Sequence, residues 1–401
     1  MKQNRKFVII GIVGVAVALP LIYLSFLNQE NLSSEEQMIL EVPSTQSIDA
    51  KVRSIKTDNP EANKILSGCG ADGHCAVEAL RELADVEQEE SVLQTLSYIT
   101  SAYAEVGFYC HGPAHHLGMF VYDITQNLTK TLEFGAKRDC GGAMYHGGIE
   151  NYFLAEMILN EGDADEIEFT HICVTLADDA KKMKRVECAH GVGHGLAKVY
   201  DHDVFRSVKR CDEFSDPTER RLCYEGVFMA NVVAYTKVGA GTFDKDDLFY
   251  PCNKLDVKYA GACYYYHASY ILDKRTTKAA FEQCNKVKPE VSLIFCYMGL
   301  GRQTSASFFD NIQGINQICE EGNPEYQRYC YQGALIVIAD HRGFEDSFEA
   351  CKVFPELFKM DCYTLLGDWI RIETPSKEDR EKGCSNAENS KYFEVCVNAR
   401  I

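Results

Sequence analysis

The stretch Cys188-Ala-His-Gly-Val-Gly-His194 places two histidines four residues apart, with a glycine directly after the first. The same spacing occurs upstream in Cys110-His-Gly-Pro-Ala-His115, and again in His146-Gly-Gly-Ile-Glu150, where glutamate takes the second position. Residues i and i+4 lie on one face of a helix, so each pair can hold one ion. Imidazole and carboxylate groups are ligands for zinc, copper and iron. The candidate metal ligands are therefore His111, His115, His146, Glu150, His190 and His194.

A cysteine repeat follows this stretch and predicts the fold. Second cysteines often open a Cys-Tyr-x-Gly motif and recur every 32 to 40 residues, a period typical of two-helix repeats. We therefore expect an all-α array of helical hairpins stapled by disulfides, either an α-solenoid or an α/α toroid. In each unit one helix is expected to end near the first cysteine and the next to begin at the second. The pairs are Cys211 with Cys223, Cys252 with Cys263, Cys284 with Cys296, Cys319 with Cys330, Cys351 with Cys362, and Cys384 with Cys396.

The histidine motifs are early members of the same series, because Cys-x-His-Gly at Cys188 aligns with Cys-Tyr-x-Gly downstream. Only the early units carry ligand-type residues at both motif positions, and this asymmetry favours metal binding over packing. The first position later becomes Glu225, Tyr265, Met298, Gln332 and Thr364, and the second becomes Met229, Ser269, Arg302, Ile336 and Asp368. His116 and Glu225 are reserve candidates, and the remaining histidines are expected at the surface or in loops (His74, His171, His202, His341) or in packing (His267).

The structural alternative is that each glycine lets another helix approach closely, with the histidine beside it satisfied in the core. Three repeats of one spacing favour a metal. The six candidates exceed one tetrahedral site, so either two ions bind or some residues act as acids, bases or groups that orient the ligands. Glu150 is the candidate general base if it is not a ligand. The positive end of a helix dipole would favour the neutral histidines that metals need.

The composition of the chain indicates the cellular compartment in which it resides. The chain has 401 residues, a net charge of −18 and 18 cysteines, without a C-x-x-C motif. The negative charge argues against nucleic-acid binding. The even cysteine count favours disulfides in an oxidising compartment over metal clusters. We expect nine bridges between sequence neighbours: the six repeat pairs together with Cys69–Cys75, Cys110–Cys140 and Cys173–Cys188.

The N-terminus predicts membrane attachment. Positive residues within 1–6 precede an uncharged run over 7–27, long enough to cross a bilayer, which indicates a cytoplasmic N-terminus and a transmembrane signal anchor. A cleaved signal peptide is the alternative. Residues 28–60 read as a flexible acidic tether, and 61–401 as the helical repeat domain, with the histidine motifs in 61–200 and the Cys-Tyr-x-Gly repeats in 201–401. The bulk of the chain is thus expected outside the cytoplasm.

Four blocks resemble those of an uncharacterised group of exported archaeal and bacterial proteins, across roughly 105–300. The blocks are Tyr109-Cys-His-Gly-Pro-Ala-His-His116, Met144-Tyr-His-Gly-Gly-Ile-Glu150, Cys188-Ala-His-Gly-Val-Gly-His194 and Gly226-Val-Phe-Met-Ala-Asn231. A looser similarity is to lanthionine cyclases, which are α/α toroids with a zinc-binding Cys-His-Gly element, here Cys110-His-Gly112. The chain lacks that family's Trp-Cys element, because its single tryptophan is Trp369. The second similarity therefore concerns architecture alone.

These observations predict a membrane-anchored extracytoplasmic protein that binds a divalent transition metal, with zinc first and copper or iron as alternatives. A metal-dependent hydrolase is one form of this hypothesis. The rivals are a non-enzymatic scaffold for a protein, peptide or glycan, and a metal storage or delivery protein. An open coordination position favours the enzyme, and a closed ligand shell favours storage or a structural ion.

Overall fold

The structure is a computed structural model that describes residues 45–135, 140–173, 182–307, 311–374 and 376–399. These residues form eighteen α-helices and no strand, which confirms the all-α prediction. Within the described part no helix is long and apolar enough to span a membrane. The predicted anchor over 7–27 lies outside the described residues, as does the segment 1–6.

The helices are α2 Thr45–Ser54, α3 Pro60–Cys69, α4 Gly73–Ala84, α5 Glu89–Ala104, α6 His111–Thr125, α7 Leu128–Gly135, α8 Ala143–Leu159, α9 Lys182–Val199, α10 Val204–Cys211, α11 Pro217–Val238, α12 Val257–Lys274, α13 Thr277–Cys284, α14 Glu290–Ser307, α15 Ile312–Glu320, α16 Gln327–Val353, α17 Glu356–Glu373, α18 Lys377–Gly383 and α19 Ser390–Val397, with short 3-10 helices η2 Gly107–Cys110, η3 Ala164–Glu166, η6 Cys252–Lys254 and η7 Cys384–Asn386.

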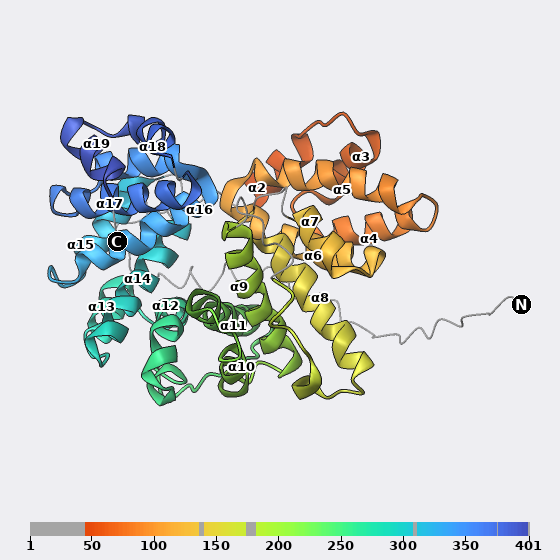
Figure 1. Ribbon diagram of the computed structural model, residues 1–401, viewed down its shortest axis with the longest axis horizontal. Helices are drawn as coiled ribbons and strands as arrows, with labels where there is room; N and C mark the ends of the chain where they lie inside the picture. The colour runs from red at the N-terminus through yellow and green to blue at the C-terminus, as the bar shows by residue number, and fades with distance from the viewer. Residues whose placement is uncertain (1–44, 136–139, 174–181, 308–310, 375, 400–401) are drawn as a thin grey trace, which may run out of the picture.

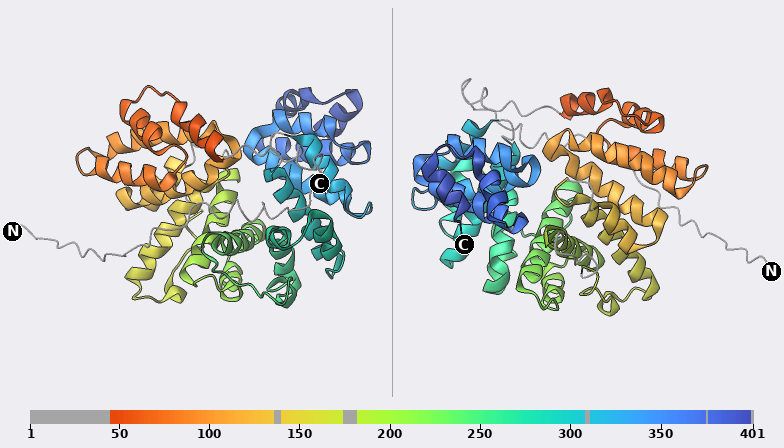
Figure 2. Two further views of the ribbon diagram at one scale, coloured as in Figure 1. Left: turned by 180° about the vertical axis from the view of Figure 1, so that it is seen from behind. Right: turned by 45° about the horizontal axis from the view of Figure 1, so that its top comes forward.

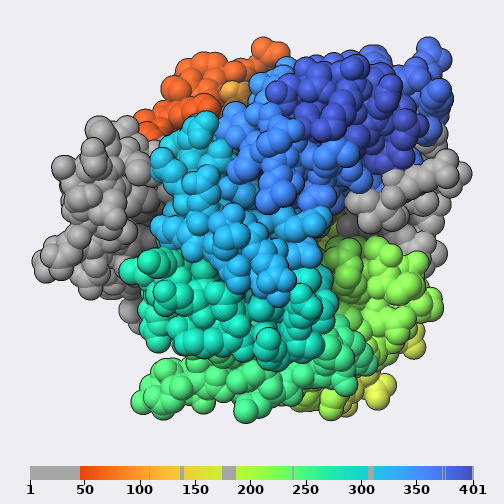
Figure 3. All heavy atoms as spheres, turned by 90° about the vertical axis from the view of Figure 1, so that its left-hand side faces the viewer, coloured from red at the N-terminus to blue at the C-terminus, as the bar shows by residue number. Residues whose placement is uncertain are grey.

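Long helices follow one another around an arc, from orange through green to blue (Figure 1). Helices α6, α8, α9, α11, α12, α14 and α16 each contact the next in this order. The shorter helices α7, α10, α13 and α15 each pack on the long helix that follows them in sequence. Figure 3 shows the C-terminal units stacked in chain order, from green at the bottom to dark blue at the top. Each long helix thus has a neighbour of the same kind on either side.

The arc brings its far end back to the N-terminal helices. Helix α16 contacts η2, which directly precedes α6, and all three ribbon views show blue and orange helices side by side (Figures 1 and 2). The His341 ring on α16 lies 6.3 Å from the His111 ring. A Cβ on Gly141 would lie 2.6 Å from the His341 ring. This contact brings residues that are far apart in sequence close to one another.

Disulfides hold the corners between helices. All nine predicted bridges are present, each between sequence neighbours. Helices α10 and α13 end at the first cysteine of their pairs, Cys211 and Cys284, as expected. The six repeat bridges are Cys211–Cys223, Cys252–Cys263, Cys284–Cys296, Cys319–Cys330, Cys351–Cys362 and Cys384–Cys396.

The expected start of the next helix at the second cysteine is wrong. Helix α11 begins at Pro217 and α14 at Glu290, each about two turns before its cysteine, because Asp216 caps the first turn of α11 and Pro289 precedes α14. Each of these six staples therefore attaches inside a helix rather than at its first residue. The second cysteines lie within their helices as follows: Cys223 in α11, Cys263 in α12, Cys296 in α14, Cys330 in α16, Cys362 in α17 and Cys396 in α19.

The tyrosine after the second cysteine fixes the same corner. Tyr224 Oη donates a hydrogen bond to Asp212, at 2.5 Å, and Tyr297 Oη donates one to Asn285, at 2.8 Å. In both cases the acceptor residue directly follows the first cysteine of the pair. Packing between repeats, the role expected from the sequence, is also present: Tyr297 Oη accepts from the backbone N–H of Asn323 in the next unit, at 3.0 Å.

The N-terminal part differs from the sequence prediction in one respect. The range 28–60, expected to be a flexible tether, contains helix α2, because Ile48 and Val52 are buried against the helices that follow. Helices α4 and α5 come next and are separated at 85–88. Helix α8 contributes to two apolar clusters, Met144 to the N-terminal one and Tyr145 to the other, because α8 packs against helices on both sides.

Glycines in the repeated motif allow the long helices to touch through their backbones. A Cβ on Gly226 of α11 would lie 2.0 Å from the backbone oxygen of His190 on α9, and a Cβ on Gly333 of α16 would lie 1.9 Å from that of Met298 on α14. The close-packing role that the sequence left as an alternative is therefore confirmed for the glycines. It does not account for the histidines beside them.

Replacing Gly333 with alanine is expected to lower the free energy of unfolding by about 1–3 kcal/mol or more, because α14 and α16 must separate. Gly68→Ala, near the end of α3, is the matched control, since nothing lies within 4 Å of its added Cβ. It should raise stability by about 0.5–1 kcal/mol. Denaturant unfolding of the oxidised protein measures both. Equal effects of the two substitutions would contradict the role given to the backbone contact.

Candidate metal centre

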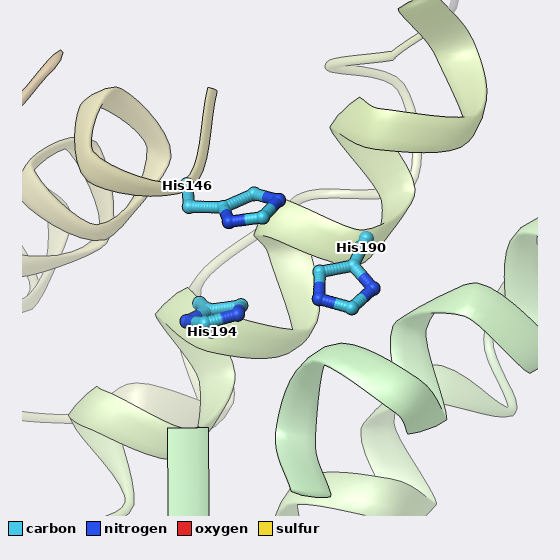
Figure 4. A group of neighbouring side chains, drawn as sticks. All are labelled: His146, His190 and His194. Atoms are coloured by element: carbon cyan, nitrogen blue, oxygen red, sulfur yellow. The ribbon is translucent and has the colours of Figure 1, made fainter. Parts of the chain in front are cut away.

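Helices α8 and α9 bring three histidines together. His146 projects from α8, and His190 and His194 project from α9, with the rings turned toward one another (Figure 4). Their side chains each offer a nitrogen, and these atoms lie within 4.8 Å of one another. The three residues are only 2%, 7% and 3% exposed. The His146 ring stacks on those of His194 and His190, at centroid distances of 4.6 and 4.8 Å. The sequence prediction that motifs two and three would meet agrees with this geometry.

A second group adjoins the first and shares His194. His115, Glu150 and His194 also offer atoms within 4.8 Å of one another. Glu150 Oε1 lies 3.3 Å from His115 Nε2 and 3.5 Å from His194 Nδ1. Because Nδ1 of His194 faces Glu150, Nε2 is the nitrogen that could bind an ion together with His146 and His190. Motif one thus reaches the cluster through His115 and α6.

Several ring nitrogens in the cluster lack a hydrogen-bond partner within the described residues. Both nitrogens of His146 are buried without one, as are Nε2 of His190 and Nδ1 of His115. A buried polar group left unsatisfied costs about 1–3 kcal/mol. Buried polar atoms in native proteins are nearly always satisfied, so this concentration in one place is the strongest local sign of a ligand.

His111 lies at the edge of the cluster, outside both groups. Its Nδ1 lies 2.9 Å from the backbone oxygen of Cys140, and since a carbonyl can only accept, Nδ1–H is the donor. Its ring centroid is 5.2 Å from that of His146. The Cys110–Cys140 bridge holds the two ends of this contact together. Of the six predicted ligands, His111 is therefore the one that belongs to neither group.

Burial keeps the central histidines neutral. The pKa values of His111, His146 and His190 all lie well below the ordinary value, first because burial disfavours the charged form and second because neighbouring histidines would repel a proton. The expected helix-dipole effect is not the cause at His190, which lies in the interior of α9 rather than at its start. Burial alone would raise the pKa of Glu150, but His115 and His194 outweigh it and hold that pKa below its ordinary value.

Two residues near the cluster were missed by the sequence analysis. Glu187 Oε2 lies 3.6 Å from His146 Nε2. Its position three residues before His190 put it on the ligand face of α9, and this spacing is the signal that could have identified it. His341, expected at the surface or in a loop, is instead a partly buried residue of α16 beside His111, and burial of its ring lowers its pKa to about 4. Only the closure of the arc places it there, and no local pattern encodes that closure.

The remaining histidines lie outside the cluster. His171 is exposed and His202 is half-buried after α9. His74 is exposed and stacks on His116, with ring centroids 3.8 Å apart. The reserve candidate His116 thus belongs to a separate pair on α4 and α6. His267 is packed as predicted: Nε2 is 2.7 Å from the backbone oxygen of Leu248, and the ring stacks on Phe243.

The buried ring of His267, which lies away from the cluster, should make the free energy of unfolding depend on pH. Burial lowers the pKa of His267 from 6.5 to about 4. Stability from the neutral ring is therefore present above pH 6.5 and lost as the pH falls toward 4, because the unfolded chain takes up a proton first. The loss should be about 3 kcal/mol. His267→Gln should remove this part of the pH dependence in denaturant unfolding at the two pH values. An identical pH profile for both proteins would contradict it.

Comparison of the chain with protein-family models, with characterised proteins and with solved structures gave no match. The resemblance to exported archaeal and bacterial proteins, and the looser one to lanthionine cyclases, therefore remain hypotheses. The function must be argued from the site itself.

Proposed function

We propose that this chain is an extracytoplasmic metal-binding protein whose ion is held by His146, His190 and His194. The observation that carries the proposal is the convergence of buried ring nitrogens, including both nitrogens of His146 and Nε2 of His190, without hydrogen-bond partners in the described chain. An ion would satisfy one nitrogen of each ring, and Glu187 Oε2 lies 3.6 Å from Nε2 of His146. The nine disulfides support the compartment, because bridges persist in oxidising spaces.

Zinc fits this donor set best among the metals considered. Neutral imidazoles are the ligands zinc accepts, with bonds of about 2.0–2.1 Å that place tetrahedral ligand atoms about 3.4 Å apart, so the nitrogens must approach one another by up to about 1.5 Å. Side-chain rotation is sufficient for such a movement. Glu150 and Glu187 lie against His194 and His146, where carboxylates commonly orient metal-bound histidines. Their two negative charges also balance one divalent ion.

A hydrolase is the form of this function that the second group favours. Three histidines leave a coordination position open, as in catalytic zinc sites, and an ion there supplies Lewis acidity when bound. Glu150 is held against His194, one of the proposed ligands, and against His115, with its pKa below the ordinary value. A carboxylate in this state can take the proton of an attacking water, so Glu150 is the proposed general base.

Attachment to the membrane through 7–27 completes the proposal, with the helical domain outside the cytoplasm. Its support is the sequence alone: positive residues before the apolar run. A mature chain that begins after the run would show cleavage instead.

Elemental analysis of the full-length, oxidised chain tests the proposal. We expect one or two transition-metal ions per chain after purification without chelators, and uptake of zinc after chelation and dialysis. A chain that never retains a transition metal would refute the metal function and leave the scaffold hypothesis. A metal that stays inaccessible to exogenous ligands would favour storage or a structural ion over hydrolysis.

A further inference from the structure

Aromatic and charged side chains of α12 and α14 lie beside the histidine cluster. The Tyr266 ring on α12 lies 6.1 Å from the His190 ring. Arg302 on α14 places its guanidinium carbon 4.5 Å from the centre of that same Tyr266 ring, and 5.7 Å from that of Tyr265. Arg302 is thus one side chain removed from the proposed ligand His190.

Arg302 has no ion-pair partner among the described residues. Its guanidinium makes cation–π contacts but no hydrogen bond there, and no carboxylate of the described chain lies within ion-pair distance. Glu225 on α11 is paired with Arg221. The carboxylates of Glu187 and Asp340 lie against His146 and His341. The N–H groups of Arg302 are therefore left without an acceptor in the described part of a chain whose net charge is −18.

The Tyr266 ring places this charge near the cluster, because it contacts both the Arg302 guanidinium and the His190 ring. Arg302 is half-buried, and its contacts with the aromatic faces leave the N–H groups at the edge of the guanidinium free to donate hydrogen bonds. The planar guanidinium can donate two parallel hydrogen bonds to the oxygens of a carboxylate or phosphate. A divalent ion at the histidines would add to the same positive field.

The repeat explains why these groups meet. Glu225, Tyr265 and Arg302 occupy the motif positions that His190 or His194 occupies in α9. Because every unit presents those positions to the same interior, the later units supply a different chemistry to the surface that begins with the histidines. The later units thus replace the histidine ligands at these positions with a cation, Arg302, and with an aromatic ring, Tyr265, that contacts it.

We propose that Arg302, supported by Tyr265 and Tyr266, is a subsite for an oxyanion, a carboxylate or phosphate group, on the substrate of the metal site. The anion-binding part of this inference rests on Arg302 alone. The part that makes the anion a group of a substrate rests on the proposed metal function. The substrate class is a small molecule or chain end whose anionic group lies beside the position at which the metal acts.

The test is calorimetric titration of inorganic phosphate, and separately of acetate, into the zinc-loaded full-length chain. We expect binding of at least one anion, weakened about 10- to 100-fold in Arg302→Gln. Arg302→Lys should be intermediate, because it keeps the charge without the fork. Arg328→Gln is the matched control, an exposed arginine of α16 paired with Asp361. The anion that binds more tightly identifies phosphate or carboxylate as the source.

Zinc content, measured on every variant, separates this inference from the metal function. Retained zinc together with anion affinity that is equal in wild type and Arg302→Gln would overturn the subsite, as would zinc-loaded wild type that binds neither anion. If wild type takes up no zinc, the metal function fails, and the titration on the metal-free chain then decides the subsite: anion binding lost in Arg302→Gln supports it, and its absence in wild type overturns it.

Discussion

Replacing His190 and His194 together with alanine is expected to weaken zinc binding by about 1,000-fold or more. The substitution removes two of the three converging imidazoles and leaves His146 alone from α8. Structural zinc binds zinc-finger peptides with a free energy of about 10–16 kcal/mol. Removing two of three histidine ligands should therefore cost more than about 4 kcal/mol of zinc-binding free energy. Competition with a chromophoric chelator measures the affinity on the full-length chain.

The later repeats should stay folded in this variant, because each is closed by its own disulfide and packed on its neighbours. Far-UV circular dichroism checks this point. His171→Ala is the control, since His171 is exposed and outside the cluster. A double variant that folds and keeps wild-type zinc affinity would exclude the proposed site.

Glu150→Gln separates the roles that the sequence left open for this residue. A carboxylate that only orients His194 and His115 should affect zinc affinity about 10- to 100-fold. A general base should leave zinc bound and lower turnover once a substrate is known. Affinity as low as in the double histidine variant would instead make Glu150 a ligand.

Local spacing was sufficient to predict much of the site. The i, i+4 pairs in α8 and α9 lie on the helix faces that meet, and the cysteine spacing identified every bridge. These features depend on contacts within one unit or between consecutive units. The helix starts differ from the prediction for a local reason too, because the cap at Asp216, and not the cysteine motif at Cys223, sets the first turn of α11.

Curvature was the property that the sequence did not encode locally. His341 reaches His111, and Arg302 reaches Tyr266 and the field of His190, only because the arc turns far enough to bring its units toward one interior. The rotation between successive units is set by close backbone contacts such as Gly226 with His190. Small rotations accumulate over the array, so distant pairs could not be assigned from spacing.

Reduction of the disulfides is expected to unfold the protein at moderate temperature. Six consecutive bridges close loops with sequence separations of 12, 11, 12, 11, 11 and 12. In the chain-entropy treatment each such bridge stabilises the fold by about 3 kcal/mol, or roughly 18 kcal/mol for six. That sum exceeds the usual 5–15 kcal/mol stability of a domain. Loss of the helical circular dichroism signal as thiols appear would follow.

Removing one bridge at a time distinguishes this effect on global stability from an effect on the proposed metal site. Cys384→Ser with Cys396→Ser opens the last corner and should cost about 3 kcal/mol of stability while zinc affinity stays unchanged. Cys173→Ser with Cys188→Ser should lower stability and zinc affinity together, because Cys188 lies two residues before His190 on α9. Mass mapping of the untreated chain should find nine bridges between neighbours. Mostly free thiols, or full helicity after complete reduction, would refute the role of the bridges and the inferred oxidising compartment.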